Sequence, residues 1–142
     1  MPLKLPVASV VALLGPAAVR AQVCAALDEN TARCAGGHGG LRVTRLGAQS
    51  GDALLDRLDA VRSTQARIVL VERLTAGLDS GARRLVLSAL EDLVGAGATV
   101  VVDDDDPVAV LAVADAVLRV TPAGEVLLET LPDAQALAPL LP

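Results

Sequence analysis

The sequence contains no phenylalanine, tryptophan or tyrosine among its 142 residues. This absence excludes aromatic cages for cationic ligands, stacking platforms for nucleic-acid bases and the aromatic belts of membrane-interface segments. Lysine and histidine are almost absent as well, since Lys4 and His38 are the single copies. Only Lys4 could therefore provide a catalytic amine, and metal sites that need two histidines are excluded.

Cysteine and positive charge are also scarce. The two cysteines, Cys24 and Cys34, have a spacing that fits neither a CxxC redox motif nor a zinc cluster, and they make no disulfide framework. We expect both to be reduced, mostly buried thiols. With a net charge of −5 the chain lacks the basic footprint of a nucleic-acid-binding protein, so no nucleic-acid partner is expected.

Long hydrophobic runs are missing too. No apolar stretch reaches the roughly 18 residues of a membrane-spanning helix, so we expect no direct membrane insertion. The stretch Leu5–Leu14 follows Lys4 and resembles a short signal peptide, but Pro6 and Pro16 interrupt the apolar sequence and Arg20 lies beside the expected cleavage site. The sequence therefore predicts a cytoplasmic protein. With 53% hydrophobic residues it has enough apolar material for one domain with a sizeable core.

Short apolar runs alternate with helical patterns along the chain, which is typical of an α/β fold with a mainly parallel sheet flanked by helices. The runs Ile68–Val71 and Val100–Val102 show no polar alternation, as expected for strands that are buried on both faces. We expect six strands, at Val7–Leu14, Leu41–Leu46, Arg67–Glu72, Ala98–Asp103, Ala116–Val120 and Glu125–Glu129.

Three segments between these strands carry helical patterns. One begins at Asp79 or Ser80, either of which can cap its first turn, and stops at the glycines that start with Gly95. Another spans Asp106–Asp115, with its first residue as the cap and Pro107 at the first helical position. The positions expected to face the core are Leu85, Leu87, Leu90, Leu93 and Val94 in the first helix, and Leu54, Leu55, Leu58 and Val61 in a third helix at Gln49–Arg62.

The segment Arg67–Asp79, RIVLVERLTAGLD, is similar to the strand and loop of ATP-binding-cassette (ABC) ATPases, which follow a hydrophobic strand with DEPTAGLD. Downstream, Ala89–Val126 continues the resemblance without a gap, through segments similar to the family's GATVLLVTHDP and ADRVLRL. The resemblance implies a P-loop-type α/β fold. The residues that fit the family's D-loop region letter for letter are Thr75, Ala76, Gly77, Leu78 and Asp79. They imply contact across an ATPase-type dimer interface, and turn formation with helix capping is an interpretation that can hold at the same time.

The first half of the chain resembles the same family but departs from it at the phosphate loop. Gly15 and Pro16 match the residues that follow the family's phosphate-loop strand. Beyond them the glycines are replaced, Ala21 stands in place of the phosphate-binding lysine, and Gln22 in place of the magnesium-binding serine or threonine. Arg20 is a cation one position too early. Because a phosphate loop needs glycines whose amides surround the anion and a lysine that neutralises it, we expect no bound nucleotide or other cofactor.

The residues for metal binding and water activation are changed as well. Glu72 occupies the position of the magnesium-associated aspartate, and Arg73 replaces the carboxylate that would polarise the attacking water. An arginine cannot act as a general base, because its pKa exceeds ~12. Asp105 aligns with the histidine expected to contact the γ-phosphate. The family's long helical subdomain is missing, because Gly47 runs almost directly into Gln49–Arg62. The resemblance therefore implies a chain that is not an enzyme and does not dock to a membrane domain in the family's ordinary way.

A run of four carboxylates ends one expected strand and comprises Asp103, Asp104, Asp105 and Asp106. One interpretation is a site for a divalent cation, since hard cations prefer several oxygens and ligands bind at this edge of an open α/β sheet. The interpretation we favour is a solvated loop in which the last aspartate caps a helix. His38 lies among glycines and is interpreted as part of a surface loop. The apolar tail at 131–142 either binds a partner or covers an edge of the sheet.

We therefore expect residues 1–142 to form one minimal, degenerate ABC-ATPase-like domain that does not hydrolyse nucleotide. Its expected role is that of a pseudo-ATPase subunit or regulator. It would pair with an intact ABC ATPase or with itself through Thr75–Asp79, and so belong indirectly to a transporter complex. One alternative is a self-assembling scaffold with no role in transport. A second is a nucleotide- or metal-sensing domain whose site is rebuilt from Arg20, Glu72 and the four aspartates.

Overall fold

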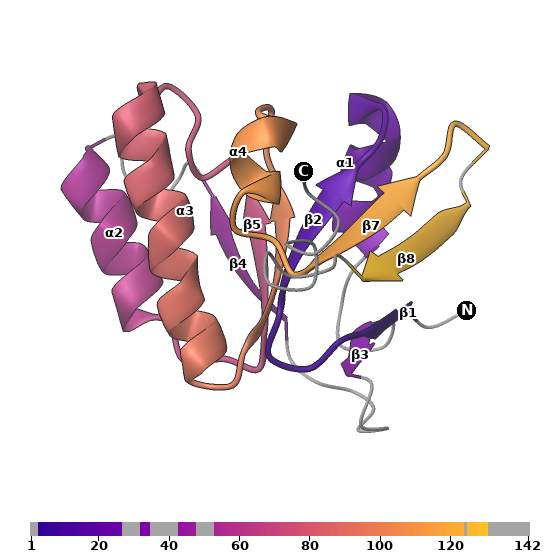
Figure 1. Ribbon diagram of the computed structural model, residues 1–142, viewed down its shortest axis with the longest axis horizontal. Coiled ribbons are helices and arrows are strands. Elements are labelled where there is room, and N and C mark those ends of the chain that lie inside the picture. The colour runs from indigo at the N-terminus through magenta and orange to yellow at the C-terminus, as the bar shows by residue number, and fades with distance from the viewer. Residues whose placement is uncertain (1–2, 27–31, 35–42, 48–52, 124, 131–142) are drawn as a thin grey trace, which may run out of the picture.

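The computed structural model describes residues 3–26, 32–34, 43–47, 53–123 and 125–130. Strands and helices alternate along most of this chain, as Figure 1 shows. The elements are β1 (Leu3–Leu5), β2 (Val10–Leu14), α1 (Ala17–Ala26), β3 (Ala32–Cys34), β4 (Val43–Gly47), α2 (Leu54–Ser63), β5 (Ile68–Glu72), α3 (Ser80–Gly95), β6 (Thr99–Asp103), α4 (Pro107–Leu111), β7 (Ala116–Val120) and β8 (Val126–Thr130).

Six strands form one sheet in the order β4-β5-β6-β2-β7-β8. Its neighbouring strands are parallel except β7 and β8, which pair as an antiparallel hairpin. The predicted α/β fold with a mainly parallel sheet is therefore confirmed. The central strands are buried on both faces, since Val69, Leu70, Val100 and Val101 are all 0% exposed, and this explains why their sequences do not alternate. A separate parallel pair, β1 and β3, was not expected from the sequence.

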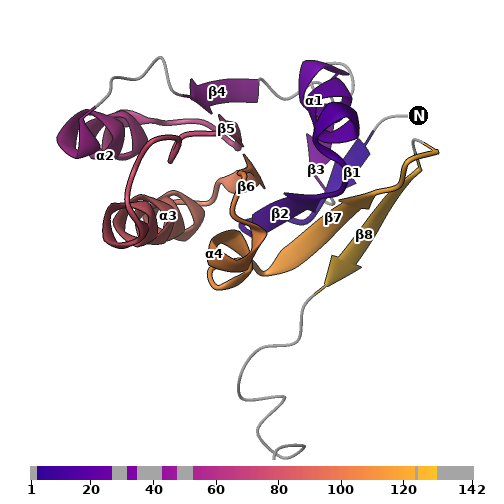
Figure 2. The ribbon, with the colours of Figure 1, turned by 90° about the horizontal axis from the view of Figure 1, so that it is seen from above.

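Helices cover both faces of the large sheet, as seen from above in Figure 2. Leu87 of α3 and Val110 of α4 belong to the same apolar core as Val10 of β2. Cys24 of α1 packs with Val11 in a second core on the opposite face. The two neighbours in β2 serve different cores because successive side chains of a strand point to opposite faces. No helix in the described part of the chain combines the length and the apolar character that crossing a bilayer requires.

The start of α3 is confirmed, and the end of α4 differs from the expectation. Asp79 caps α3, because its carboxylate Oδ1 accepts a hydrogen bond from the backbone N–H of Ala82 at 2.8 Å. The helix α4 starts at Pro107 as predicted but ends at Leu111, well before Asp115. The physical reason lies at Asp115, whose carboxylate and backbone N–H both bond to the backbone of the first residue of β2, at 2.9 and 2.8 Å. This attachment to the sheet draws the chain out of the helix.

Other expected boundaries and faces are wrong in detail. β2 begins three residues later than expected, because Val7 is 55% exposed and Ala8 has a left-handed φ of 50°. Ala53 is extended, so α2 starts at Leu54. Leu55 and Leu85 were expected in the core but are 68% and 56% exposed. Several predictions lie outside the described residues: those for His38, for 41–42 and 49–52, and for the tail at 131–142.

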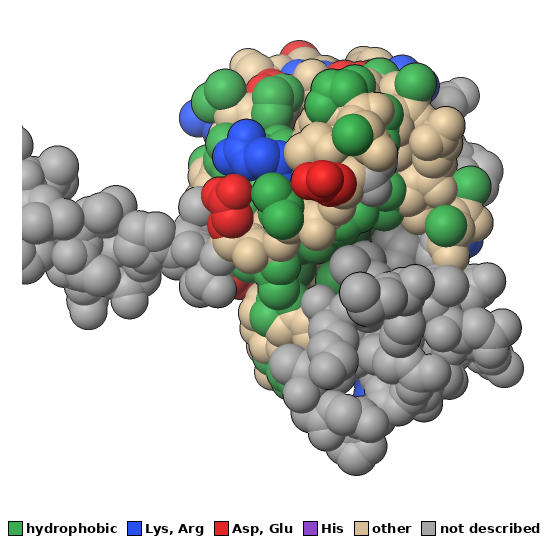
Figure 3. Space-filling view, turned by 90° about the vertical axis from the view of Figure 1, so that its right-hand side faces the viewer, with side chains coloured by type: hydrophobic (Ala, Val, Ile, Leu, Met, Phe, Trp, Pro, Cys, Tyr) green, Lys and Arg blue, Asp and Glu red, His purple; other side chains and the backbone are tan. Residues whose placement is uncertain are grey.

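The strand β8 forms one edge of the sheet and has an apolar outer surface. Val126, Leu127 and Leu128 are 38%, 49% and 44% exposed. Figure 3 shows this side of the molecule, where green hydrophobic side chains lie beside blue and red ones. One ion pair of this surface joins Arg119 of β7 to Glu129 at 3.3 Å.

Candidate functional site

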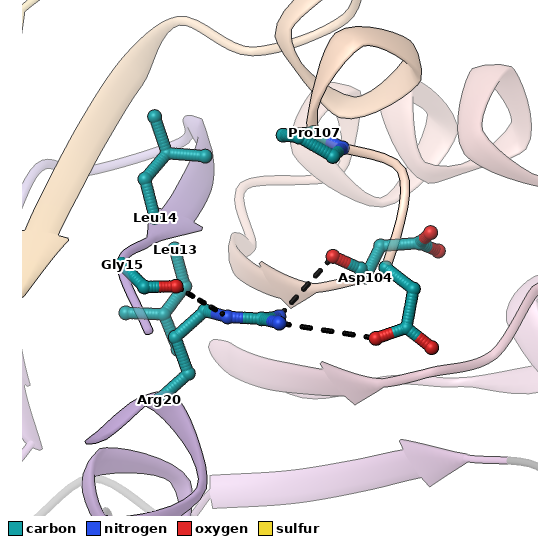
Figure 4. A pocket seen from close by; sticks show the side chains of 7 residues that line it. Leu13, Leu14, Gly15, Arg20, Asp104 and Pro107 are labelled. Carbon is teal, nitrogen blue, oxygen red and sulfur yellow. Dashed lines mark hydrogen bonds and ion pairs between the residues drawn. The ribbon is translucent and has the colours of Figure 1, made fainter. Parts of the chain in front are cut away.

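A pocket of about 410 Å³ lies at the C-terminal ends of β2 and β6. After β2 the chain enters α1 on one face of the sheet, and after β6 it enters α4 on the other face, so the two connections diverge here. In open α/β sheets, ligands bind at such a point of divergence. The pocket is lined by Leu13, Leu14, Gly15, Arg20, Asp104, Asp105 and Pro107, which Figure 4 draws.

The connection from β2 to α1 is very short. It consists of Gly15 and Pro16, and the Pro16 carbonyl accepts hydrogen bonds from the N–H groups of Val19 and Arg20 at 3.0 and 2.9 Å. Gly15 has a φ of +142°, and a Cβ there would overlap the carbonyl oxygen of Val120. Only glycine fits this conformation and this close approach. The residues that follow Pro16, from Ala17 onward, form the first turn of α1.

The side chain of Arg20 extends across the polar end of the pocket. Its Nε donates to the Gly15 carbonyl at 3.0 Å, and its Nη1 donates to the Asp103 carboxylate and to the Asp104 carbonyl at 3.2 Å. Its Nη2 lies 3.8 Å from Asp105 Oδ1, and Figure 4 shows the guanidinium between Gly15 and Asp104. The Arg20 and Asp103 side chains are each only 12% exposed. A largely buried ion pair made by the protein itself thus fills this end of the pocket.

Cys24 lies behind this ion pair. Its Sγ donates to Asp103 Oδ2 at 3.7 Å. Burial raises the pKa of Asp103, and the Arg20 charge opposes this rise. Burial, together with the Asp103 charge, raises the pKa of Cys24 to about 12. The thiol is therefore protonated at neutral pH, and its burial agrees with the expected buried, reduced Cys24.

Asp104 is also buried, which makes the solvated-loop interpretation wrong for the first half of the acidic run. It is 5% exposed, and its carboxylate accepts from the Thr75 hydroxyl and from the backbone N–H of Asp106 at 2.9 Å. Arg83 joins the same network through the Thr75 hydroxyl at 3.1 Å and the Asp106 carboxylate at 3.2 Å. The predicted capping by Asp106 is confirmed, because its Oδ1 accepts from an amide in the first turn of α4 at 3.1 Å.

The four aspartates do not converge on one point. Each turns to a different partner: Asp103 to Arg20, Asp104 to Thr75, Asp105 to Arg73 and Asp106 to Arg83. A divalent cation needs about six oxygens around a common centre. Among the described residues, no group of three or more His, Cys, Asp or Glu side chains is placed to hold a metal ion.

Glu72 ends β5 and Arg73 follows it, next to this network. Glu72 accepts a hydrogen bond from Arg45 at 2.6 Å. Arg73 has a left-handed φ of 53°, a conformation that costs energy outside glycine, and its N–H donates to the Asp103 carbonyl at 2.7 Å. Its guanidinium contacts Asp105 Oδ2 through Nη2 at 2.9 Å and Nε at 3.1 Å. The Glu72 and Arg73 side chains are thus both engaged in ion pairs.

The segment Thr75–Asp79 forms a turn at the same edge of the sheet. Ala76 N–H donates to the Arg73 carbonyl at 3.1 Å, Leu78 N–H donates to the Thr75 carbonyl at 3.0 Å, and Gly77 has a φ of +80°. Thr75 is 1% exposed and faces inward. Of this segment, Gly77 and Asp79 are exposed and Ala76 and Leu78 are half-buried, so only the part from Ala76 onward can contact another molecule.

Arg57 of α2 holds this turn from inside, and the sequence analysis missed it. It is 4% exposed, and its Nη1 donates to the carbonyls of Leu74 at 2.9 Å and of Ala76. A signal was present, because position 57 falls in the helical stripe that also contains Leu54 and Val61. A charged residue in a core-facing stripe indicates a buried polar contact.

No protein-family model matches this sequence, and no curated protein matches it either. Membership of the ABC ATPase family is therefore a proposal. The geometry at the ends of β2, β5 and β6 does not depend on this membership. In this geometry the cationic and anionic side chains form ion pairs with one another.

Proposed function

We propose that this chain is a non-hydrolysing domain of the ABC-ATPase-like type that pairs, as a subunit or regulator, with an intact ABC ATPase. The observation that carries the proposal is the position of Arg20. Its guanidinium lies in the pocket at the end of β2, where an ATPase of this type would bind phosphate, and Asp103 and the Gly15 carbonyl hold it there.

The absence of turnover follows from three chemical requirements of ATP hydrolysis. The phosphates need a cradle of amides and a cation, the metal needs a free carboxylate, and the water needs a base. Here the cradle is replaced by the first turn of α1, Glu72 is paired with Arg45, and position 73 carries a guanidinium where a carboxylate base would be needed. These replacements support a role in which the domain has an ATPase-like fold but does not hydrolyse ATP.

Pairing with another protein is supported by the turn at Thr75–Asp79. Arg57 and Asp104 hold it from inside through hydrogen bonds, while Gly77 and Asp79 face outward. A surface turn that is already held in one conformation loses little entropy when it binds. This is the property expected of a contact segment.

The test combines turnover with partner capture. The purified protein should release no phosphate from Mg-ATP under conditions in which an ABC ATPase with an intact phosphate-loop lysine does so. Cross-linking in extracts of the native cells should yield an ABC ATPase with a complete phosphate loop. Ala76→Glu, in the turn, should reduce that yield, whereas Ala96→Glu, on the exposed end of α3, should leave it unchanged. Turnover, or capture of unrelated proteins only, would refute the proposal.

A second candidate function is self-assembly, which the apolar outer surface of β8 favours. An edge strand with exposed apolar side chains is a template for pairing with another strand. Leu127→Lys should then dissolve an oligomer seen by light scattering, whereas Leu85→Lys, at a comparably exposed leucine of α3, should not. A monomer at all concentrations would exclude this function.

A further inference from the structure

The strand β8 ends the large sheet (Figure 1), and no strand among the described residues pairs with its outer edge. The hairpin fixes which backbone groups face that edge. Thr121 N–H donates to the Glu125 carbonyl at 2.9 Å, and this pair continues the register of β7 and β8. Because hydrogen-bonded and non-hydrogen-bonded pairs alternate in antiparallel strands, Leu127 directs its backbone groups to β7, whereas Val126 and Leu128 direct theirs outward. The edge therefore offers donors and acceptors to another strand.

The side chains of this strand follow a pattern that is the same in both directions. Three apolar residues lie in its middle: Val126, Leu127 and Leu128. Glu125 precedes them and Glu129 follows, and all five side chains are exposed. An antiparallel partner strand runs in the opposite direction, so a second copy of this segment presents the same pattern to it. The pattern therefore indicates a second copy of the chain as the occupant of this edge.

The apolar residues determine the register in which the two copies meet. A two-fold axis at Leu127 places it opposite the partner's Leu127, and it places Val126 opposite the partner's Leu128. The outward backbone groups of Val126 and Leu128 then form the hydrogen-bonded pairs across the axis. All three exposed apolar side chains exchange water for apolar neighbours. An axis at Leu128 would instead set Leu127 against the partner's Glu129, so less apolar surface would be buried.

Charge opposes this register only weakly. It sets Glu125 opposite the partner's Glu129, and like charges directly opposite each other are unfavourable in a sheet. Arg119 of β7 compensates Glu129, because its Nε lies 3.3 Å from that carboxylate. The Arg119 and Glu129 side chains are 52% and 49% exposed, so solvent and salt weaken the remaining repulsion. Apolar burial at the centre therefore outweighs repulsion at the two ends.

We propose that two copies of this chain form a closed dimer in which β8 pairs with the partner's β8, antiparallel, with the two-fold axis at Leu127. The large sheets of the two copies then form one continuous sheet. The proposal rests on the second candidate function, self-assembly, and specifies its partner, register and closure. Because both copies use the same edge, the assembly stops at two. The turn at Thr75–Asp79 follows β5, which is four strands away from β8, and stays accessible to another protein.

The experiment is disulfide cross-linking of single cysteine substitutions in a Cys34→Ser background, under mild oxidation. Leu127→Cys should cross-link to its own copy, because a directly opposed non-hydrogen-bonded pair has its Cα atoms about 4.5 Å apart, within disulfide range. Val126→Cys and Leu128→Cys should not cross-link, because their equivalent Cα atoms lie beyond the limit of about 7 Å. Leu85→Cys, at an exposed leucine of α3, is the control for random collisions. Far-UV circular dichroism verifies that each variant folds.

A second measurement does not depend on introduced cysteines. Glu125→Gln removes one carboxylate from each of the two acidic pairs at the ends of the dimer interface. It should therefore lower the dimer Kd about 3-fold in sedimentation equilibrium at low salt. Glu91→Gln, at an exposed position of α3, changes the net charge equally and should leave the Kd unchanged.

Several results would overturn the proposed dimer. A cross-link at Leu128→Cys instead of Leu127→Cys, equal yields at all positions, or equal effects of Glu125→Gln and Glu91→Gln would each refute the register, although self-assembly would stand. Assemblies that grow beyond two copies would refute the closure. A monomer at all concentrations would refute the dimer and the second candidate function together; if Leu128→Cys then resisted maleimide, the chain's own segment at 131–142 would be the occupant of the edge. None of these readouts involves an ATPase, so the proposed pairing is tested separately.

Discussion

Replacing Arg20 by methionine tests whether the ion pair in the pocket is an integral part of the fold. Asp103 would keep its largely buried carboxylate, 12% exposed, without its cation. Breaking a buried pair from one side costs about 3–5 kcal/mol. We expect the lower end, a loss of about 3 kcal/mol in the free energy of unfolding near pH 8, because Cys24 still donates to the carboxylate.

The stability loss in Arg20→Met should depend on pH in a defined direction. Burial raises the folded-state pKa of Asp103 above its value in the unfolded chain. The stability linked to this group is therefore fully present below the unfolded pKa and is lost as the pH rises through the folded pKa. Without Arg20, which opposes the rise, the folded pKa moves higher still. The cost of Arg20→Met should consequently be smaller near pH 5 than near pH 8, because the raised pKa lets a larger fraction of Asp103 be protonated at the lower pH, and the neutral form needs no cation.

The assay is urea unfolding followed by far-UV circular dichroism, since a chain without aromatic residues has no useful intrinsic fluorescence. Arg20→Met combined with Asp103→Asn should recover most of the loss, as both charges are then gone. Arg119→Met, which breaks a half-exposed pair with Glu129, is the control and should cost at most about 1 kcal/mol. The reasoning is refuted if Arg20→Met lowers the free energy of unfolding no more than Arg119→Met does, or by the same amount at both pH values. The Arg20–Asp103 ion pair would then not be buried in solution.

Three further predictions concern other parts of the structure. Gly15→Ala should lower the free energy of unfolding by more than about 2 kcal/mol in the same assay, because Gly15 has a positive φ and lies against the backbone of β7. Gly95→Ala should change the free energy of unfolding by less than about 1 kcal/mol, because the space around Gly95 is open. Arg57→Met should cost about 2 kcal/mol and speed amide hydrogen exchange in the turn before α3, because two carbonyls lose their donor; unchanged exchange would contradict that role. In a Cys34→Ser background, Cys24 should resist iodoacetamide near pH 8 until urea unfolds the chain, since its pKa of about 12 leaves almost no thiolate; rapid labelling of the folded protein would refute its burial.

The regular parts of the fold were accessible from the sequence because local signals determine them. The apolar runs predicted β5 and β6, and Asp79 and Pro107 marked the starts of α3 and α4. Such signals act within a few residues of chain. The strands β1 and β3 gave no comparable signal, because three residues are too few to show a period.

The candidate site was accessible only in outline. Its position at the ends of the strands followed from the fold class, but the burial and the partner of each carboxylate did not. Asp103 is buried because Arg20, 83 positions away, reaches it, and Asp104 is buried because Thr75, 29 positions away, donates to it. No local pattern contains such pairs. A run of four acidic residues therefore resembles a solvated loop until the fold brings the arginines to it.

The central position of β2 has a consequence for how the chain folds. β4, β5 and β6 pair in the order in which they are synthesised, but β2 precedes them and pairs with β6 and β7, joining Val10 to Val100 and Val11 to Ala116. During translation both edges of β2 thus lack their final neighbours until most of the chain has left the ribosome. Folding should be slow for the length of the chain, since closing such long loops precedes the gain from pairing. The nascent chain should meanwhile be a substrate for chaperones that bind exposed apolar strands.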